Sequence, residues 1–169
     1  SSVDVKLISD LGSDTYFSGE LVKYDFSGNA IETIALNVLS PKDQSVTIHS
    51  MSSPDDPEHF WHIKLTPNEN SQVVVENDYL NVPWKACELQ KATVNWHVEA
   101  SANGFSIELT TDMPAFFVQL ESSVAGRFSD NSLTLLPYIK KQIHFQTALE
   151  ISAAQLAESL SCIHLRDSY

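Results

Sequence analysis

Apolar and polar residues alternate with a period of two along most of the chain. Residues 92–100 and 105–109 show the pattern most clearly, and the dipeptide Asn103-Gly104, a strong hairpin signal, lies between them. Successive side chains of a strand point to opposite faces, so this period predicts half-buried strands. The expected strands cover residues 3–8, 19–26, 30–39, 45–51, 60–65, 72–80, 92–100, 105–109, 116–120, 126–128, 133–136, 142–149 and 163–169.

These strands form two groups of six or seven, so the chain is predicted to be all-β. Short strands roughly ten residues apart are typical of antiparallel sandwiches, and an immunoglobulin-like domain takes about 100 residues. Pro83 would interrupt a central strand, which places a boundary near residues 83–91. We predict two immunoglobulin-like antiparallel β-sandwich domains in tandem, over residues 1–86 and 87–169. A single larger sandwich is the alternative.

One short helix is expected at residues 152–159. Ser152 can cap it, and Gln155 stands three residues later as its partner in a capping box. Leu156 and Leu160 would share its buried face. A helix of this length connects strands and does not form a layer of its own.

Charge and composition narrow the possible partners. The chain has 169 residues and a formal net charge of −12, from 10 basic and 22 acidic residues. Such a chain would repel nucleic acid and anionic membranes, and no segment approaches the ~20 consecutive apolar residues of a membrane span. The first residues lack the basic start and apolar core of a signal peptide, although a removed signal or an excised fragment would give the same beginning. We expect a soluble protein, with the cytoplasm favoured over the periplasm or secretion.

The two cysteines, Cys87 and Cys162, have Trp96 between them, an order that resembles antibody domains. The tyrosine expected two residues before the second cysteine is absent, because position 160 is leucine. Two cysteines in a chain of this length make no disulfide framework. We expect two free thiols, with a disulfide as the alternative.

We expect neither a metal ion nor another cofactor, and no catalytic residue. His59 and His62 would point to opposite faces of a strand and could not share one metal ion. Glu69 lies beside Asn68 in a polar turn, where nothing would desolvate its carboxyl and raise its pKa as an acid catalyst requires. The chain has no Gly-x-Ser-x-Gly elbow and no glycine-rich phosphate loop.

Tryptophans offer the remaining candidate site, because an exposed indole ring can stack on a sugar. Trp96 alternates with Val94 and Val98, as a core residue does. Trp84 stands at the expected junction, where it would fill the space between the domains. We take Trp61, and with it Trp84, as the possible sugar-stacking residues.

The run at residues 126–137, Gly-Arg-Phe-Ser-Asp-Asn-Ser-Leu-Thr-Leu-Leu-Pro, has the pattern of a strand, a polar turn and a second strand. It resembles the C-terminal immunoglobulin-like domain of β-mannosidases of glycoside hydrolase family 2. Residues 76–85, 116–120 and 163–169 resemble that family's linking segment, preceding strand and closing strand. Residues 22–31 resemble a hairpin of its penultimate sandwich.

Within this run Asp130 is interpreted as a turn former and not as a catalytic acid. Two positions depart from the family pattern. Ser132 stands where a large apolar residue is usual, and Tyr138-Ile139 stand where the family usually has Gly-Glu.

The resemblance implies that the chain is the non-catalytic C-terminal accessory region of a β-mannosidase-like hydrolase. The (β/α)8 barrel with both catalytic glutamates would lie upstream, and the chain would support it by packing against the upstream domains or by a homo-oligomeric contact. Two alternatives stay open. One is a carbohydrate-binding module, and the other is a cell-surface interaction module unrelated to sugars.

Overall fold

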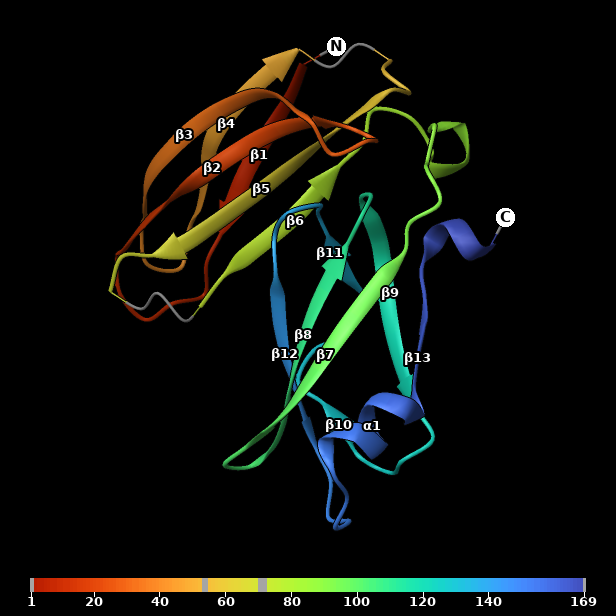
Figure 1. Ribbon diagram of the computed structural model, residues 1–169. Coiled ribbons are helices and arrows are strands. Elements are labelled where there is room, and N and C mark those ends of the chain that lie inside the picture. The colour runs from red at the N-terminus through yellow and green to blue at the C-terminus, as the bar shows by residue number, and fades with distance from the viewer. Residues whose placement is uncertain (1, 53–54, 70–72, 169) are drawn as a thin grey trace. The chain divides into compact units, whose positions relative to one another are not determined.

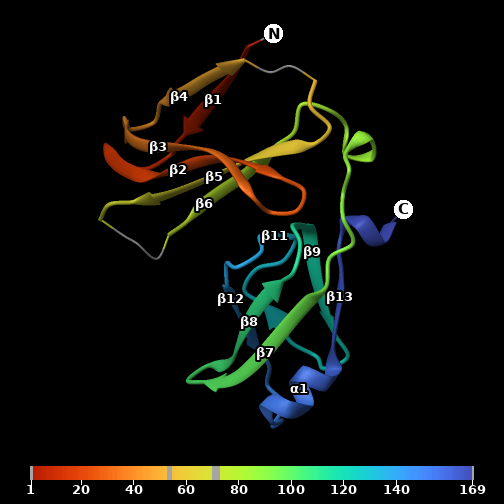
Figure 2. The same cartoon turned by 45° about the horizontal axis from the view of Figure 1, so that its top comes forward.

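The structure, a computed structural model, describes residues 2–52, 55–69 and 73–168. By its internal contacts the chain divides into two compact units, residues 1–88 and 89–169. Figures 1 and 2 show that each unit consists of antiparallel strands arranged in two sheets. The predicted all-β sandwich architecture is therefore confirmed. No helix among the described residues has the length and apolar character to cross a membrane.

The first unit combines a small sheet with a larger one. β1 (Ser2–Ile8) pairs with β4 (Ser45–Ser52), and the larger sheet has the order β3-β2-β5-β6. The strands of the larger sheet are β2 (Thr15–Asp25), β3 (Ala30–Ser40), β5 (His59–Pro67) and β6 (Val75–Tyr79). Its core consists of Leu7, Phe17, Leu21, Leu36, Trp61 and Leu65. The expected start of a strand at residue 72 lies outside the described residues.

The turn between β2 and β3 is held by one carboxylate. Asp25 accepts hydrogen bonds from the backbone N–H groups of Ser27 and Asn29, both at 2.9 Å, and from the Asn29 side-chain amide at 2.8 Å. Gly28 has a φ of 89°, which glycine adopts without steric cost. Burial opposes ionisation of Asp25, but the hydrogen bonds outweigh it and hold the pKa of this carboxyl below its usual value. The turn at residues 27–29 is thus fixed by Asp25, the last residue of β2.

The second unit has two sheets of four and three strands. The first has the order β10-β12-β8-β7 and the second the order β11-β9-β13. Their strands are β7 (Val94–Ser101), β8 (Gly104–Thr111), β9 (Ala115–Ser122), β10 (Arg127–Phe128), β11 (Leu133–Leu135), β12 (Lys141–Gln146) and β13 (Leu160–Ile163). Ile107, Leu109, Val118 and Leu156, all fully buried, lie at the centre of its core.

The predicted helix is present as α1 (Ala153–Ser159) and begins with the expected capping box. The Ser152 hydroxyl accepts from the backbone N–H of Gln155 at 3.2 Å, and the Gln155 side chain accepts from the backbone N–H of Ser152 at 2.8 Å. Leu156, on the inner face of this helix, is fully buried. The indole Nε1 of Trp96 donates to the carbonyl of Ala157 at 3.2 Å, which ties the helix to β7.

The run at residues 126–137 does not form a hairpin. β10 pairs with β12, whereas β11 pairs with β9 in the other sheet, so the polar turn carries the chain from one sheet to the other. Gly126 lies directly over the ring of Phe145, and a Cβ atom there would collide with that ring. The glycine is therefore needed for the close approach of β10 to the core.

Residues Leu165–Ser168 form a helical turn where the sequence predicted a strand. β13 stops at Ile163, and residues Leu165–Ser168 form a 3-10 helix. The Asp167 carboxylate accepts from the backbone N–H of His164 at 3.0 Å, and the backbone N–H of Asp167 donates to the His164 carbonyl, also at 3.0 Å. This local pairing competes with continuation of the strand. The expected strand at residues 163–169 is therefore confirmed only at Ile163 and wrong over residues 164–168, and residue 169 lies outside the described residues.

Candidate functional site

A hollow of about 220 Å³ lies between the two sheets of the first unit. Lys23 is the register neighbour of both Glu32 and Trp61, and the three side chains line one wall. His49 and Met51 of β4 line the facing wall. This mixture of polar and apolar groups resembles a binding pocket in character, but common ligand pockets are larger, at roughly 300–1,000 Å³.

Asp56 organises the polar rim of this hollow. Its carboxylate lies 2.8 Å from Lys23 Nζ and 2.8 Å from His59 Nδ1, and it accepts from the backbone N–H of Glu58 at 3.2 Å. Burial opposes ionisation of Asp56, but the bonds from Lys23, His59 and Glu58 outweigh it and lower the pKa to about 2. A carboxyl that stays ionised and is already bound by three donors is a poor proton donor. The cluster clamps the segment at Asp56 to β2 and β5.

Trp61 is not the exposed platform that sugar stacking requires. Its side chain is 8% exposed and belongs to the core of the first unit, together with Leu21 and Leu65. Part of the ring also lines a second hollow of about 190 Å³, which Tyr79 and Ile63 border as well. The expected exposure of Trp61 is thus contradicted by its packing. The sequence already indicated a core position, because Trp61 alternates with Ile63 and Leu65 as Trp96 does with Val94 and Val98.

The other tryptophans have different surroundings. Trp84 begins a short 3-10 helix, Trp84–Ala86, and is half-buried. Its possible role in sugar stacking stays a prediction. Trp96 is half-buried against the core of the second unit, on the face that the alternation predicted.

His59 and His62 contact different carboxylates. His59 binds Asp56, as described above, while His62 Nδ1 lies 2.8 Å from Asp78 Oδ1 on the neighbouring strand β6. Among the described residues, no group of three or more histidine, cysteine or acidic side chains is placed to hold a metal ion. Each histidine thus contacts a carboxylate of its own.

Where the fold clearly shifts the pKa of a carboxyl group, it lowers the pKa and so favours the ionised form. For Asp112, the hydrogen bond from the backbone N–H of Thr93, at 2.6 Å, is the main cause of its lowered pKa, and burial opposes it only partly. Asp25 and Asp56 are shifted in the same direction. A glycosidase acid needs a raised pKa, so none of these three is suited to that role. Glu76 faces Lys64 on β5, with 4.0 Å between carboxylate and Nζ, and Glu69 is exposed.

Cys87 and Cys162 are free thiols, as predicted. Burial raises the pKa of the Cys87 thiol. Burial, with a smaller effect of the Asp167 charge, raises the pKa of Cys162 to about 11. A nucleophilic cysteine needs a lowered pKa, so neither thiol is activated.

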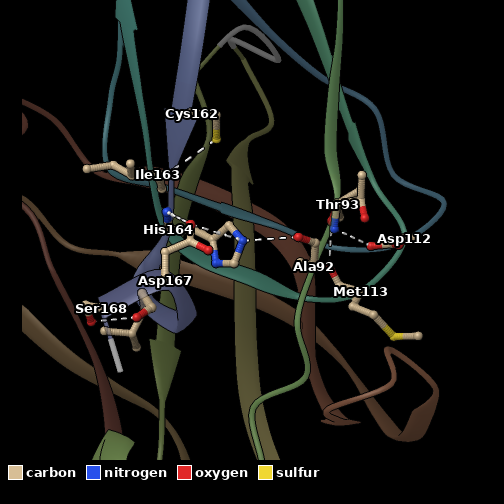
Figure 3. A network of polar contacts seen from close by, with 11 residues as sticks. Ala92, Thr93, Asp112, Met113, Cys162, Ile163, His164, Asp167 and Ser168 are labelled. Atoms are coloured by element: carbon tan, nitrogen blue, oxygen red, sulfur yellow. Dashed lines mark hydrogen bonds and ion pairs between the residues drawn. The ribbon is translucent and has the colours of Figure 1, made fainter.

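A polar network joins the end of the second unit to its beginning (Figure 3). His164 Nε2 lies 3.2 Å from the carbonyl of Ala92, which can only accept, so this nitrogen donates the hydrogen bond. Arg166 Nε donates to the carbonyl of Leu89 at 3.2 Å. His164 is 8% exposed, and its Nε2 is also 3.4 Å from Asp167. These contacts could not be predicted from the sequence, because their partners lie more than 70 positions apart.

The second unit matches a known family. Residues 89–168 match the model of Ig_mannosidase, an Ig-fold domain. This match confirms the resemblance to the C-terminal domain of β-mannosidases. No curated protein sequence matches the chain.

Solved structures extend the similarity to both units. The β-D-mannosidase of Dictyoglomus thermophilum is similar over 96% of this chain, with a TM-score of 0.82 and 19% identity. The exo-chitosanase CsxA of Amycolatopsis orientalis is similar over 95% of the chain, with a TM-score of 0.63 and 13% identity. At these identities the likeness is one of fold. The matched regions make up 20% and 24% of those two chains, so this chain spans about a fifth to a quarter of their length.

In the Ig_mannosidase domain, the run at residues 126–137 acts through Asn131. Its side-chain Oδ1 accepts from the backbone N–H of Leu120 at 2.9 Å, and its Nδ2 donates to the Leu120 carbonyl at 3.0 Å. The amide thus pairs with β9 as a strand residue would. Asp130 is exposed, and its carboxylate accepts a hydrogen bond from the backbone N–H of Asn131 at 2.8 Å. This geometry fits a turn former.

Proposed function

We propose that this chain is the non-catalytic C-terminal accessory region of a β-mannosidase-like glycoside hydrolase. It packs against upstream domains that include a (β/α)8 catalytic barrel and so supports the active enzyme. The observation that carries the proposal is that 96% of this chain matches only 20% of the Dictyoglomus thermophilum β-D-mannosidase. The Ig_mannosidase domain at residues 89–168 supports the same placement.

The chemistry of the described residues supports a structural role. Asp25, Asp56 and Asp112 have lowered pKa values, and the two thiols have raised ones. Both directions are opposite to what an acid catalyst or a thiolate nucleophile requires. The buried position of Trp61 weighs against the carbohydrate-binding alternative.

A deletion tests the supporting role. We expect the complete polypeptide to hydrolyse a chromogenic β-mannoside, and a version that lacks residues 89–169 to melt at a lower temperature and to lose activity faster on incubation at 37 °C. The reason is that removal of a packed domain exposes apolar surface on its neighbour. Unchanged melting and inactivation in the deletion variant would contradict the proposal, as would a complete polypeptide with no activity on β-mannosides.

A further inference from the structure

The turn after β11 holds a tyrosine in a backbone conformation that favours glycine. The backbone N–H of Ile139 donates to the Leu136 carbonyl at 3.3 Å and closes a four-residue turn. Pro137 restricts its own φ to near −65°, and Tyr138 at the third position has a φ of 66°. This combination defines a type II turn, whose third position prefers glycine or asparagine. A bulky side chain with positive φ strains the backbone there.

The strain is not offset by packing of the tyrosine ring in the structure. Tyr138 is 99% exposed, and the adjacent Ile139 is 46% exposed. In contrast, Leu135 and Leu136 just before the turn are 1% and 5% exposed. The chain is therefore anchored up to Leu136 and then projects two apolar side chains into solvent. Strained positions that persist in this way are often functional.

We propose that Tyr138 and Ile139 are docking residues that insert into an apolar recess on an upstream domain of the same polypeptide. This inference rests on the proposed function, in which this chain is one part of a longer enzyme. The matched β-D-mannosidase has four fifths of its length outside the region that resembles this chain, and such a length leaves room for the domain that would hold the recess. Tyrosine suits such a contact, since it buries a large apolar ring while its hydroxyl keeps a hydrogen-bond partner. Lys140, the next residue, lies 2.9 Å from Glu108, so its charge is already paired within the domain.

The first experiment measures what Tyr138 does in residues 1–169 alone. We expect Tyr138→Gly and Tyr138→Asn to melt at the same temperature as the unaltered chain or up to roughly 2–4 °C higher, because both residues accept the left-handed conformation. Leu149→Ala is the matched control, since Leu149 is an apolar side chain of the same unit and is 54% exposed. A fall of several degrees in both Tyr138 variants, absent in the control, would show that the ring packs within the chain and would overturn the proposal.

The second experiment asks whether the turn is covered in the complete polypeptide. Hydroxyl-radical footprinting with mass spectrometry should label Tyr138 at least five-fold less in the complete polypeptide than in residues 1–169 alone. In the complete polypeptide, Tyr138→Gly should lower the melting temperature, the opposite sign to its effect on the chain alone, while Leu149→Ala should not. Equal labelling of Tyr138 in the two samples would overturn the proposal.

The remaining outcomes separate this inference from the proposed function. Protection of Tyr138 that disappears on dilution, together with dissociation of an oligomer, would assign the contact to a second copy and overturn the proposal. Protection by added manno-oligosaccharide alone would assign it to a sugar and also overturn it. A complete polypeptide that protects Tyr138 but does not hydrolyse β-mannosides would support docking and contradict only the proposed function.

Discussion

Asn131 is the residue whose side chain replaces a missing strand partner. Its amide makes both a donor and an acceptor contact with the backbone of Leu120, a residue that is 2% exposed. The sequence marked Asn131 as a turn residue, which it is. The pairing with β9 could not be predicted, because it depends on which strands become neighbours across eleven positions.

Asn131→Ala should destabilise the chain by about 2 kcal/mol, since it leaves the buried N–H and C=O of Leu120 without partners. The measurement is urea denaturation followed by circular dichroism at pH 7. Asp130→Ala provides the control, and it should change the free energy of unfolding by less than about 0.5 kcal/mol because Asp130 is exposed. Equal effects of the two substitutions would contradict the role assigned to Asn131.

Asp56 makes stability depend on pH in the acid range. Its folded-state pKa is about 2, lowered from 3.8, so the ionised carboxylate stabilises the native state above about pH 4. That stabilisation, about 2 kcal/mol, is lost as the pH falls from 4 through 2. Asp56→Ala should therefore flatten the decline of the urea midpoint between pH 4 and pH 2. Asp55→Ala, a substitution of the exposed neighbour, should leave the decline as steep as in the unaltered chain.

At the scale of elements, the period of two identified the strands well because their faces differ in burial. β8 shows this clearly, since every second residue from Phe105 to Thr111 is buried. The capping box also predicted α1, because both of its hydrogen bonds are local in sequence. The order of the strands within the sheets could not be predicted from these local patterns. β10 and β11 are only four residues apart, yet they lie in different sheets.

The end of the chain shows the same limit at one element. The alternation after Cys162 is typical of a strand, but Leu165–Ser168 form a 3-10 helix, in which Asp167 accepts a hydrogen bond from the backbone N–H of His164. The sequence contained a possible capping residue. The buried His164 also contacts the carbonyl of Ala92, and no local pattern reveals this second contact.

His164→Ala should loosen the attachment of the last helical turn to the start of the second unit. The substitution removes a buried donor to the Ala92 carbonyl, so the expected loss is about 1–3 kcal/mol. Hydrogen exchange should quicken at the amide of Thr93, which lies beside Ala92 and is bonded to Asp112. His97→Ala is the control, because the His97 side chain is 70% exposed. Unchanged exchange at Thr93 in the His164 variant would contradict this account.

At the scale of the molecule, the chain is a pair of compact β units with small internal hollows. The polar groups around Trp61 form a structural clamp, and the perturbed carboxyls are held in their ionised state. Trp61 was taken as a possible sugar-stacking residue, a role that requires an exposed ring. Its place in the core depends on Leu7 of β1 and Leu36 of β3, which belong to distant parts of the sequence.

The fold class and the family could be predicted because the repeated strand pattern and the run at residues 126–137 are local signals. The function proposed for the whole polypeptide rests instead on a comparison of the length of this chain with that of a matched enzyme. The chain matches a fifth of a β-D-mannosidase. That proportion supports the proposal that a catalytic domain lies elsewhere in a longer polypeptide.

The most direct test of the central claim is an assay of residues 1–169 on p-nitrophenyl β-D-mannoside. The account predicts no release of nitrophenol above that of a blank preparation from cells without the gene, at any pH from 4 to 8. The complete polypeptide, assayed at the same molar concentration, should release it readily. Turnover by residues 1–169 that stays with the protein through a second purification step would contradict the claim that this chain is non-catalytic.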